Sequence, residues 1–189
     1  VYTNGRQVVP GPPRGFLIIS PLYETANEEP DGIHLLCLSR GVTSDAFADA
    51  PWLLGGVKTL SYAVNVAALR YARAPGADAA LFPSTDGYLL EGPTSGLVIA
   101  ADDGLWTTPT GPTGILNSIT VSTVFEAAGE DGVQTSTRLM KHGEVLRAQG
   151  AWLLSSVRGV APILSIDGHP VPQDEDTTHR LRTWAGFEN

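Results

Sequence analysis

The chain has 189 residues, of which 42% are hydrophobic, a composition that supports a packed core and excludes a disordered chain. Its net charge is −8 without any block of like charges, which argues against nucleic acid or an anionic membrane as the main partner. No uninterrupted apolar run approaches the roughly 18 residues that a membrane span needs. The single cysteine, Cys37, excludes an internal disulfide and fits a reducing, cytoplasmic location. The four histidines show no metal-ligand spacing, so no metal is expected.

The first part of the chain, residues 1–48, is rich in loops. Two apolar segments, 16–20 and 33–39, are predicted strands with a polar turn between them. The chain starts in a strand-like segment that lacks the order of a signal peptide, so we expect a fragment of a longer protein. The small-residue stretch 44–51 is a candidate linker, which divides the chain into residues 1–48 and a domain over 49–189.

The second part mixes helices and short strands. Periodicity and turn signals predict helices at 57–74, 118–132, 143–150 and 176–187, the last capped by Asp176 or Thr177. Strands are predicted at 79–84, 87–92, 96–101, 132–140, 151–156 and 160–168. This mixture of hairpins and helices predicts an α+β fold rather than a doubly wound sheet.

Lys58 is isolated from other charges, among glycine, leucine and alanine. It stands at the start of the predicted helix 57–74, and Tyr62 follows one turn later on the same face. A helix N-terminus repels a cation, and apolar surroundings favour the neutral, nucleophilic amine. Lys58 is therefore a candidate nucleophile, and the plain alternative is a surface lysine at a helix start.

Glu91 is the only charge in the predicted strand 87–92. A carboxylate in a half-buried strand is costly unless it is paired, and a cationic ring nitrogen is one partner that would satisfy it. The alternative is an outward-facing residue on an edge strand.

A third feature is the predicted helix start near Ile119. Asn117 or Ser118 would cap this helix, and free backbone N–H groups with the hydroxyls of Ser118 and Thr120 form a candidate phosphate site. The alternative is an ordinary capped helix. Farther along, Ser156 ends a predicted buried strand, where its hydroxyl bonds either backbone or ligand.

These groups offer an amine, a phenol, an acid for a pyridinium nitrogen and a phosphate cradle, which are the attachment points of pyridoxal phosphate. The motifs "KTLSY", "DGYLLEGPTS", "GILNSIT", "SSVRGVAPI" and "IDG", in this order, resemble the class IV, fold-type IV family of pyridoxal-phosphate enzymes. That family includes branched-chain aminotransferases, D-amino acid aminotransferases and aminodeoxychorismate lyases. The resemblance implies a large C-terminal domain of mixed, mainly antiparallel sheets in a pseudobarrel with flanking helices. Residues 1–48 would then be the end of the small α/β domain and the linker.

The resemblance also implies roles for particular residues. Lys58 matches the lysine that forms the Schiff base with pyridoxal 5′-phosphate and moves the proton, Glu91 the acid on the pyridine nitrogen, and Tyr62 the phenol near the ring oxygen. The other implied cofactor-binding residues are Thr94, Ser95, Ser118, Ile119, Thr120 and Ser156. Two arginines, Arg14 and Arg158, match substrate-binding positions.

The sequence departs from the family pattern at three places. Gly96 replaces the usual Asn, while Ser118 and Val121 replace the Gly and Arg of the phosphate loop, which predicts weaker phosphate binding. Relatives also have most of a small domain before this chain begins, which supplies a phosphate-binding arginine and part of the substrate pocket. We therefore expect weak or no activity from these residues alone.

Within the family, Arg14 followed by Gly15 and Phe16 fits the lyases better than the Arg-x-His of D-amino acid aminotransferases. The first expectation is an aminodeoxychorismate lyase that releases pyruvate and 4-aminobenzoate from 4-amino-4-deoxychorismate, in folate biosynthesis. One alternative is an aminotransferase that acts on branched-chain or D-amino acids with 2-oxoglutarate. The other is a binding or structural domain that kept the fold and lost the chemistry. The resemblance further implies a homodimer with a small amino substrate.

Overall fold

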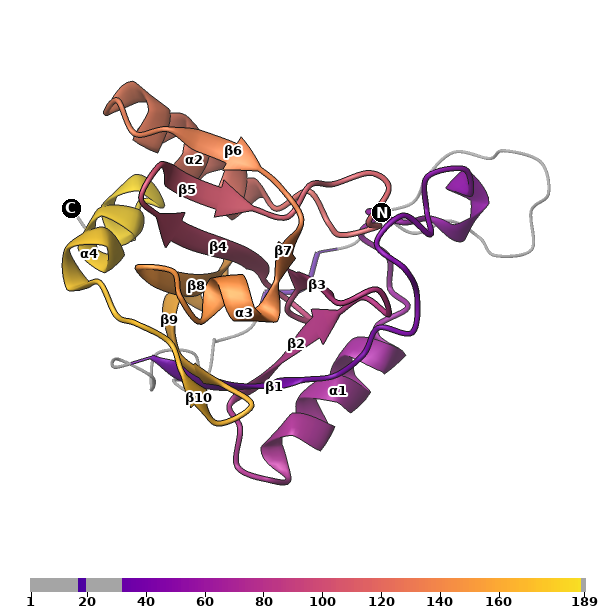
Figure 1. Cartoon of the computed structure of the whole chain (residues 1–189). Helices are drawn as coiled ribbons and strands as arrows, with labels where there is room; N and C mark the ends of the chain where they lie inside the picture. The colour runs from indigo at the N-terminus through magenta and orange to yellow at the C-terminus, as the bar shows by residue number, and fades with distance from the viewer. Residues whose placement is uncertain (1–16, 20–31, 188–189) are drawn as a thin grey trace.

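The computed structural model describes residues 17–19 and 32–187 (Figure 1). The strands in this part are β1 (Ile33–Cys37), β2 (Ala79–Pro83), β3 (Tyr88–Glu91), β4 (Gly96–Ala101), β5 (Gly104–Thr107), β6 (Thr135–Thr137), β7 (Met140–Lys141), β8 (Gly150–Ser155), β9 (Gly159–Ile166) and β10 (His169–Pro170). The helices are α1 (Ala63–Arg73), α2 (Ile119–Glu130), α3 (His142–Val145) and α4 (Glu175–Trp184), and η2 (Pro51–Leu53) is a 3₁₀ turn. The α+β class is the one predicted from the sequence.

The described strands form one mixed sheet in the order β6-β5-β4-β8-β9-β1-β2-β3-β7, with β10 paired to β9. Most neighbours are antiparallel, whereas β1 runs parallel to both β2 and β9, and β5 runs parallel to β6. The sheet curls, so that β3 near one end comes back into contact with β4 of the other half (Figure 1).

Curling explains why the strands are apolar on both faces. In β4, Leu97 and Ile99 point into the cluster enclosed by the sheet, while Val98 and Ala100 belong to a second cluster on the outer face. Alternation of side chains along a strand sends successive residues to opposite faces, and both faces here are covered. The continuous apolar runs that predicted strands in the sequence therefore reflect two-sided burial.

Helices cover the outer face in two places. Helices α2 and α4 pack over β8, where the indole N–H of Trp152 donates a hydrogen bond to Thr178 Oγ1 at 2.8 Å. Helix α1 lies along β2 (Figure 1) and contributes the small side chains of Ala68 and Ala72 to a third cluster. The site described below lies where the loop before α1 meets the ends of β3 and β4 and the start of α2.

Several predicted elements differ from the observed ones. The helix predicted over 57–74 begins only at Ala63, and the strand predicted over 132–140 is broken into β6 and β7. The short helix predicted over 143–150 is the four-residue α3. Strand β5 was not predicted, because its four residues lie between a turn and a Thr-Pro loop and show no periodicity.

At the ends of the described part, α4 is capped by the side chain of Asp174, which accepts from the backbone N–H of Thr177, rather than by Asp176 or Thr177. The strand predicted over 16–20 is only partly described, and residues 17–19 carry no strand. The domain boundary predicted near residue 48 stays a prediction, although β1, on its N-terminal side, belongs to the same sheet as the later strands. Among the described residues, none of the helices is both long and apolar enough to cross a lipid bilayer.

Candidate active site

A pocket of about 210 Å³ opens between the loop that precedes α1, the β3–β4 turn and the start of α2. Six of the predicted site residues line it: Lys58, Tyr62, Glu91, Thr94, Ser95 and Ser118. These residues come from three segments that are far apart in the sequence, so their convergence is a result of the fold. The pocket is therefore the candidate active site.

Lys58 lies in an exposed loop rather than in a helix, because α1 begins five residues later. Its Nζ is 3.4 Å from the hydroxyl of Tyr62, the residue just before α1. The expected pairing of amine and phenol is thus present, but a loop and not a helical turn brings it about. Loop attachment leaves the amine free to reorient toward a ligand.

The two glycines before Lys58 place this loop. At Gly55 a Cβ atom would lie 2.4 Å from the ring of Phe47, so only glycine fits there. Gly56 has a φ of +76° and donates a backbone hydrogen bond to the carbonyl of Gly114 at 2.9 Å. The glycines therefore hold the Lys58 loop against the loop that leads into α2.

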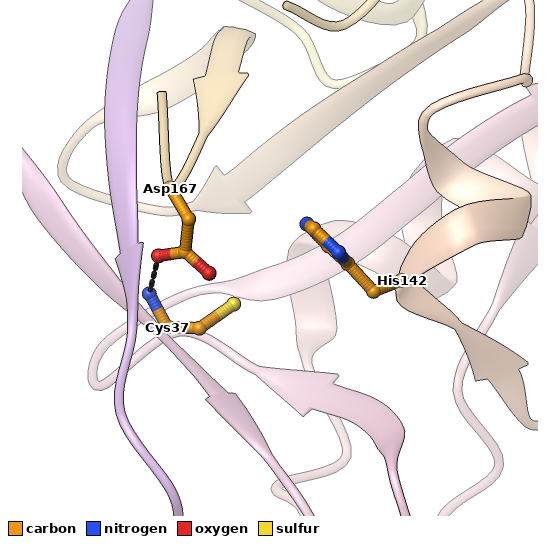
Figure 2. Close-up of side chains that lie close together, drawn as sticks. All are labelled: Cys37, His142 and Asp167. Atoms are coloured by element: carbon orange, nitrogen blue, oxygen red, sulfur yellow. Dashed lines mark hydrogen bonds between the residues drawn. The ribbon is translucent and has the colours of Figure 1, made fainter. Parts of the chain in front are cut away.

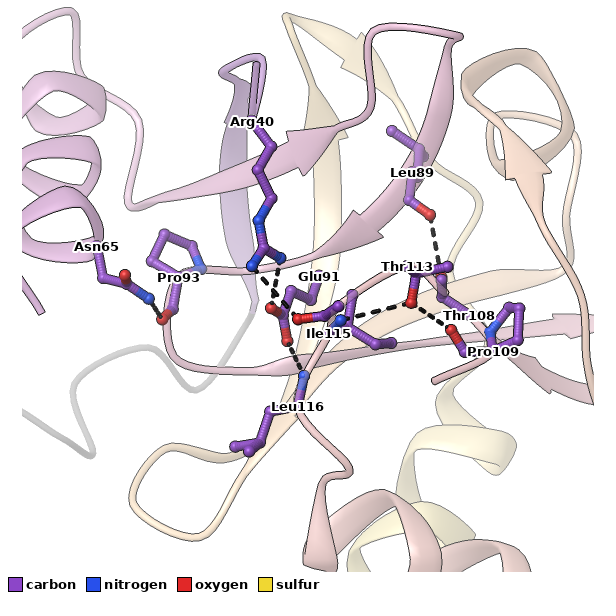
Figure 3. A network of polar contacts seen from close by, with 11 residues as sticks. Arg40, Asn65, Leu89, Glu91, Pro93, Thr108, Pro109, Thr113, Ile115 and Leu116 are labelled. Carbon is purple, nitrogen blue, oxygen red and sulfur yellow. Dashed lines mark hydrogen bonds and ion pairs between the residues drawn. The ribbon is translucent and has the colours of Figure 1, made fainter. Parts of the chain in front are cut away.

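Glu91 sits at the end of β3 in the centre of a polar network (Figure 3). Its Oε1 pairs with Arg40 at 2.9 Å, and its Oε2 accepts from the backbone N–H of Leu116 at 3.1 Å. The Arg40 guanidinium also donates to the carbonyl of Gly114 at 3.4 Å. A carboxylate offers about four lone-pair sites, so Glu91 can still accept a hydrogen bond from a ligand in the pocket.

The electrostatics of Glu91 are set by opposing effects. Burial raises the pKa of its carboxyl above the ordinary value, while the charge of Arg40 and the N–H of Leu116 lower it to a smaller extent. Lys58 also lowers this pKa, as the weakest of the contributions. A buried acid of this kind is stabilised in its charged form by a further cation or N–H donor.

The raised pKa predicts a pH-dependent difference in stability between the wild type and Glu91→Gln. The folded state binds the Glu91 proton more tightly than the unfolded chain, so the benefit to wild-type stability is full below the ordinary pKa of 4.5. This benefit is lost as the pH rises through the raised value. We therefore expect the free energy of unfolding of the wild type to fall, relative to that of the variant, from acidic to neutral pH. Urea titration of the cofactor-free chain measures both free energies. A difference that stays constant or grows with pH would contradict the burial of a charged Glu91.

The β3–β4 turn forms another wall of the pocket. Gly92 donates a backbone hydrogen bond to the carbonyl of Ser95 at 2.8 Å, which closes the turn around exposed Thr94 and buried Ser95. The side-chain amide of Asn65 in α1 donates to the carbonyl of Pro93 (Figure 3). This contact ties the first turn of α1 to the pocket wall.

Helix α2 begins at the third wall. Ser118 is its N-cap, and its Oγ accepts from the backbone N–H of Val121 at 3.4 Å. Ser118 is one of the two caps that the sequence predicted, the other being Asn117. A Cβ atom on Gly96 would lie 2.8 Å from the Val121 side chain. The structure thus links two of the departures from the family pattern, because a larger residue at 96 does not fit beside Val121.

Four further predicted residues lie outside this pocket. Ile119 is exposed, Thr120 is buried in α2, and Ser156 and Arg158 lie in the β8–β9 turn; none of the four lines the pocket. Arg14 lies outside the described residues. The predicted phosphate set is therefore only partly brought together by the pocket lining.

The structure adds two residues that the sequence interpretation missed. Arg40 pairs with Glu91, and Asn65 fastens α1 to the β3–β4 turn. No local pattern marks either one, because Arg40 is 51 positions from Glu91 and Asn65 lies 28 positions before Pro93. An unpaired charge in an apolar strand could have suggested only that Glu91 needed some distant cation.

Comparisons with known proteins give the family. Residues 4–166 match the model of the amino-transferase class IV family. A curated relative, the bifunctional aminodeoxychorismate lyase / D-amino acid transaminase of Mycobacterium tuberculosis (strain ATCC 25618 / H37Rv), is 36% identical over 92% of this chain and 62% of its own length. The chain belongs to the amino-transferase class IV family, and it spans less than two thirds of this relative.

Solved structures agree with this assignment. A fold IV-transaminase from Curtobacterium pusillum has a TM-score of 0.79 and 40% identity, over 86% of this chain and 54% of that chain. A hypothetical aminotransferase from Mycobacterium tuberculosis, in its PLP-bound form, has a TM-score of 0.83 and 37% identity, over 89% and 60% of the two chains. The fold is that of the fold-type IV enzymes, as the resemblance implied.

Pyridoxal 5′-phosphate is the cofactor of this family, and the described residues fit it. The buried Glu91 carboxylate can accept from a protonated ring nitrogen, and the amine of Lys58 and the phenol of Tyr62 face the same pocket. The N-terminus of α2, capped by Ser118, adds a site that favours an anion. The set therefore offers one partner for each polar part of the cofactor.

Proposed function

We propose that the protein is a pyridoxal-phosphate-dependent enzyme in which Lys58 transfers the proton at the α-carbon of an amino substrate. The convergence of Lys58, Tyr62 and Glu91 on one pocket is the observation that carries this proposal. Bound pyridoxal phosphate supplies an electron sink that acidifies the α C–H bond of a substrate attached to it. The Lys58 amine then removes and returns the proton, since its loop leaves it within reach of the pocket.

The other proposed roles follow from position. The Glu91 carboxylate would accept a hydrogen bond from the cofactor ring nitrogen, with Arg40 and the Leu116 N–H holding the carboxylate in place. The Tyr62 hydroxyl would hydrogen-bond the ring oxygen beside Lys58. The β3–β4 turn (Thr94, Ser95) and the α2 start (Ser118, Ile119, Thr120) with Ser156 are proposed cofactor contacts, and Arg14 and Arg158 proposed substrate contacts.

Our first candidate reaction is cleavage of 4-amino-4-deoxychorismate to 4-aminobenzoate and pyruvate. The Arg-Gly-Phe motif at 14–16 supports it, and so does the similarity to a relative whose name includes aminodeoxychorismate lyase. The second candidate is transamination of a D- or branched-chain amino acid. It is supported by the same bifunctional relative and by a D-alanine aminotransferase from Bacillus licheniformis that is 28% identical.

One set of assays separates the candidates. The full-length protein, loaded with pyridoxal phosphate, is given aminodeoxychorismate alone, and then D-alanine or L-leucine with 2-oxoglutarate. We expect 4-aminobenzoate and pyruvate in the first assay. Glutamate in the second without 4-aminobenzoate in the first would make the protein an aminotransferase. A protein that shows no visible absorbance of bound cofactor would instead be the domain that lost the chemistry.

We also propose that the working form is a homodimer, located in the cytoplasm. Large apolar side chains are exposed beside the pocket, on η2 and the loop before α1 and on α1 itself: Trp52, Leu60, Val64 and Tyr71 are each at least 66% exposed. Apolar surface of this extent is typical of faces covered by another chain or segment. Light scattering on the full-length protein measures whether its mass is that of two chains. The cytoplasmic location rests on the single cysteine alone.

A further inference from the structure

Three side chains with metal-binding atoms meet away from the active-site pocket. Cys37 ends β1, His142 begins α3, and Asp167 lies in the turn between β9 and β10 (Figure 2). One ligand atom from each lies within 4.8 Å of those of the other two. These residues are separated by 105 and 25 positions in the sequence, so the fold alone brings them together.

One ring nitrogen of His142 has no hydrogen-bond partner in the part of the chain that the structure describes. Its Nε2 atom is buried and makes no hydrogen bond to any described residue. The ring points toward Cys37 and Asp167 (Figure 2). Nearly all buried polar atoms in proteins are satisfied, and an exception calls for an explanation such as a bound ion.

Asp167 is held in position by the backbone. Its Oδ1 accepts a hydrogen bond from the Cys37 N–H at 2.7 Å, and its other oxygen faces the Cys37 sulfur (Figure 2). Its φ of +53° is the left-handed conformation that the two-residue Asp-Gly turn between β9 and β10 favours at its first residue. The turn and this hydrogen bond therefore fix the carboxylate beside the thiol.

The types of atom in this cluster suit a cation. A sulfur atom, a carboxylate oxygen and a ring nitrogen without a hydrogen-bond partner among the described residues lie together. A divalent ion placed between them would stabilise both the thiolate and the carboxylate.

We propose that Cys37, His142 and Asp167 bind a zinc ion. Thiolate, imidazole and carboxylate are the ligands that Zn²⁺ takes in proteins, with bonds of about 2.0–2.3 Å and tetrahedral geometry. That geometry separates ligand atoms by roughly 3.3–3.8 Å. Side-chain rotations that move the ligand atoms together by about 1 Å would bring the observed spacing to this range. The fourth position is open to water, since Asp167 is exposed and gives a path for entry.

The consequence of zinc binding is structural. The ion would join the end of β1, the β9–β10 turn and the start of α3, which lie close together at this cluster but far apart in the sequence. It would stabilise the folded chain without touching the pocket, because none of the three ligands lines it. The site is independent of the proposed enzyme function.

Cobalt provides the direct test, since Co²⁺ takes zinc sites and its thiolate complexes absorb in the near ultraviolet. The chain contains one cysteine, so any cobalt–thiolate absorption comes from Cys37. We expect the cofactor-free, metal-stripped chain to bind about one Co²⁺ with this absorption and to lose it when Zn²⁺ is added. A chain whose spectrum shows no cobalt–thiolate absorption overturns the proposal, whatever any variant does.

Variants then identify the ligands. Cys37→Ser, His142→Gln and Asp167→Asn are each expected to weaken Zn²⁺ binding by at least roughly 100-fold. Even replacing a residue that only hydrogen-bonds a metal ligand lowers metal affinity by about 10- to 100-fold. The matched controls His179→Gln and Asp176→Asn replace exposed residues of α4 and should bind zinc like the wild type. Zinc should also slow the reaction of Cys37 with a thiol reagent in the wild type. Equal zinc affinity in the ligand and control variants would overturn the assignment.

Discussion

Replacement of Lys58 by alanine is expected to lower kcat by at least roughly 10³-fold with any amino substrate that the protein accepts. The physical reason is that one amine attaches the cofactor and also carries the proton, and general acid–base catalysis alone contributes 10²- to 10⁴-fold. No other lysine lines the pocket, so no second amine in the described chain can take over these steps. The variant should also lose the visible absorbance of covalently bound cofactor.

The sequence provides a strict control for this prediction. The chain has only two lysines, and the second, Lys141, lies in β7 with its Nζ 5.4 Å from the centroid of the Tyr88 ring. Lys141→Ala should retain both turnover and absorbance. Borohydride reduction of the holoenzyme should fix the cofactor to the peptide that contains Lys58, which mass spectrometry of a digest detects. Fixation on Lys141, or turnover retained by Lys58→Ala, would remove Lys58 from the proposed mechanism.

Strands were the elements best predicted from the sequence. Segments such as "GLVIAA" are apolar throughout, because the curled sheet buries one face inside and the other under helices. Short strands without such runs were missed, as β5 shows. Apolar runs in the sequence therefore predicted which strands are buried on both faces. They did not predict how the strands pair, because pairing depends on partners far along the chain.

The start of α1 shows how one helix boundary was misplaced. Regular spacing predicted a single apolar helical face, but only Ala68 of its five residues is buried; the five are Leu60, Val64, Ala67, Ala68 and Tyr71. The face that packs on β2 is made of Ala68 and Ala72, whose small size permits close approach. An apolar stripe indicates that a surface will be covered, without saying whether this chain or another covers it.

Some residues of the candidate active site could likewise be predicted from the sequence and others could not. Lys58, Tyr62 and Glu91 could be found because a lone charge in apolar sequence is unusual and motif order supported the assignment. Arg40 could not, because an arginine in a loop carries no sign of the carboxylate that it will meet. The Cys37 cluster was missed for a similar reason: metal-ligand spacing is a local signal, and its three residues come from three separate segments.

Glu91→Gln is expected to lower kcat by roughly 10²- to 10³-fold, the range seen when one preorganised electrostatic contact is removed from an active site. The amide keeps the shape of the side chain and can still accept from the Leu116 N–H, but it has no charge to stabilise a protonated ring nitrogen. Arg40 would also lose its ion-pair partner, which places a half-buried positive charge near that nitrogen and disfavours its protonation further.

The measurement compares kcat and the cofactor absorbance of Glu91→Gln with those of Glu130→Gln, which makes the same change at an exposed position at the end of α2. The control should behave like the wild type. Because burial of the Glu91 charge opposes folding at neutral pH, Glu91→Gln should lose turnover without losing stability there. Loss of both together would mean that the variant acts through the fold, whereas full turnover would mean that the ring nitrogen is held by another group.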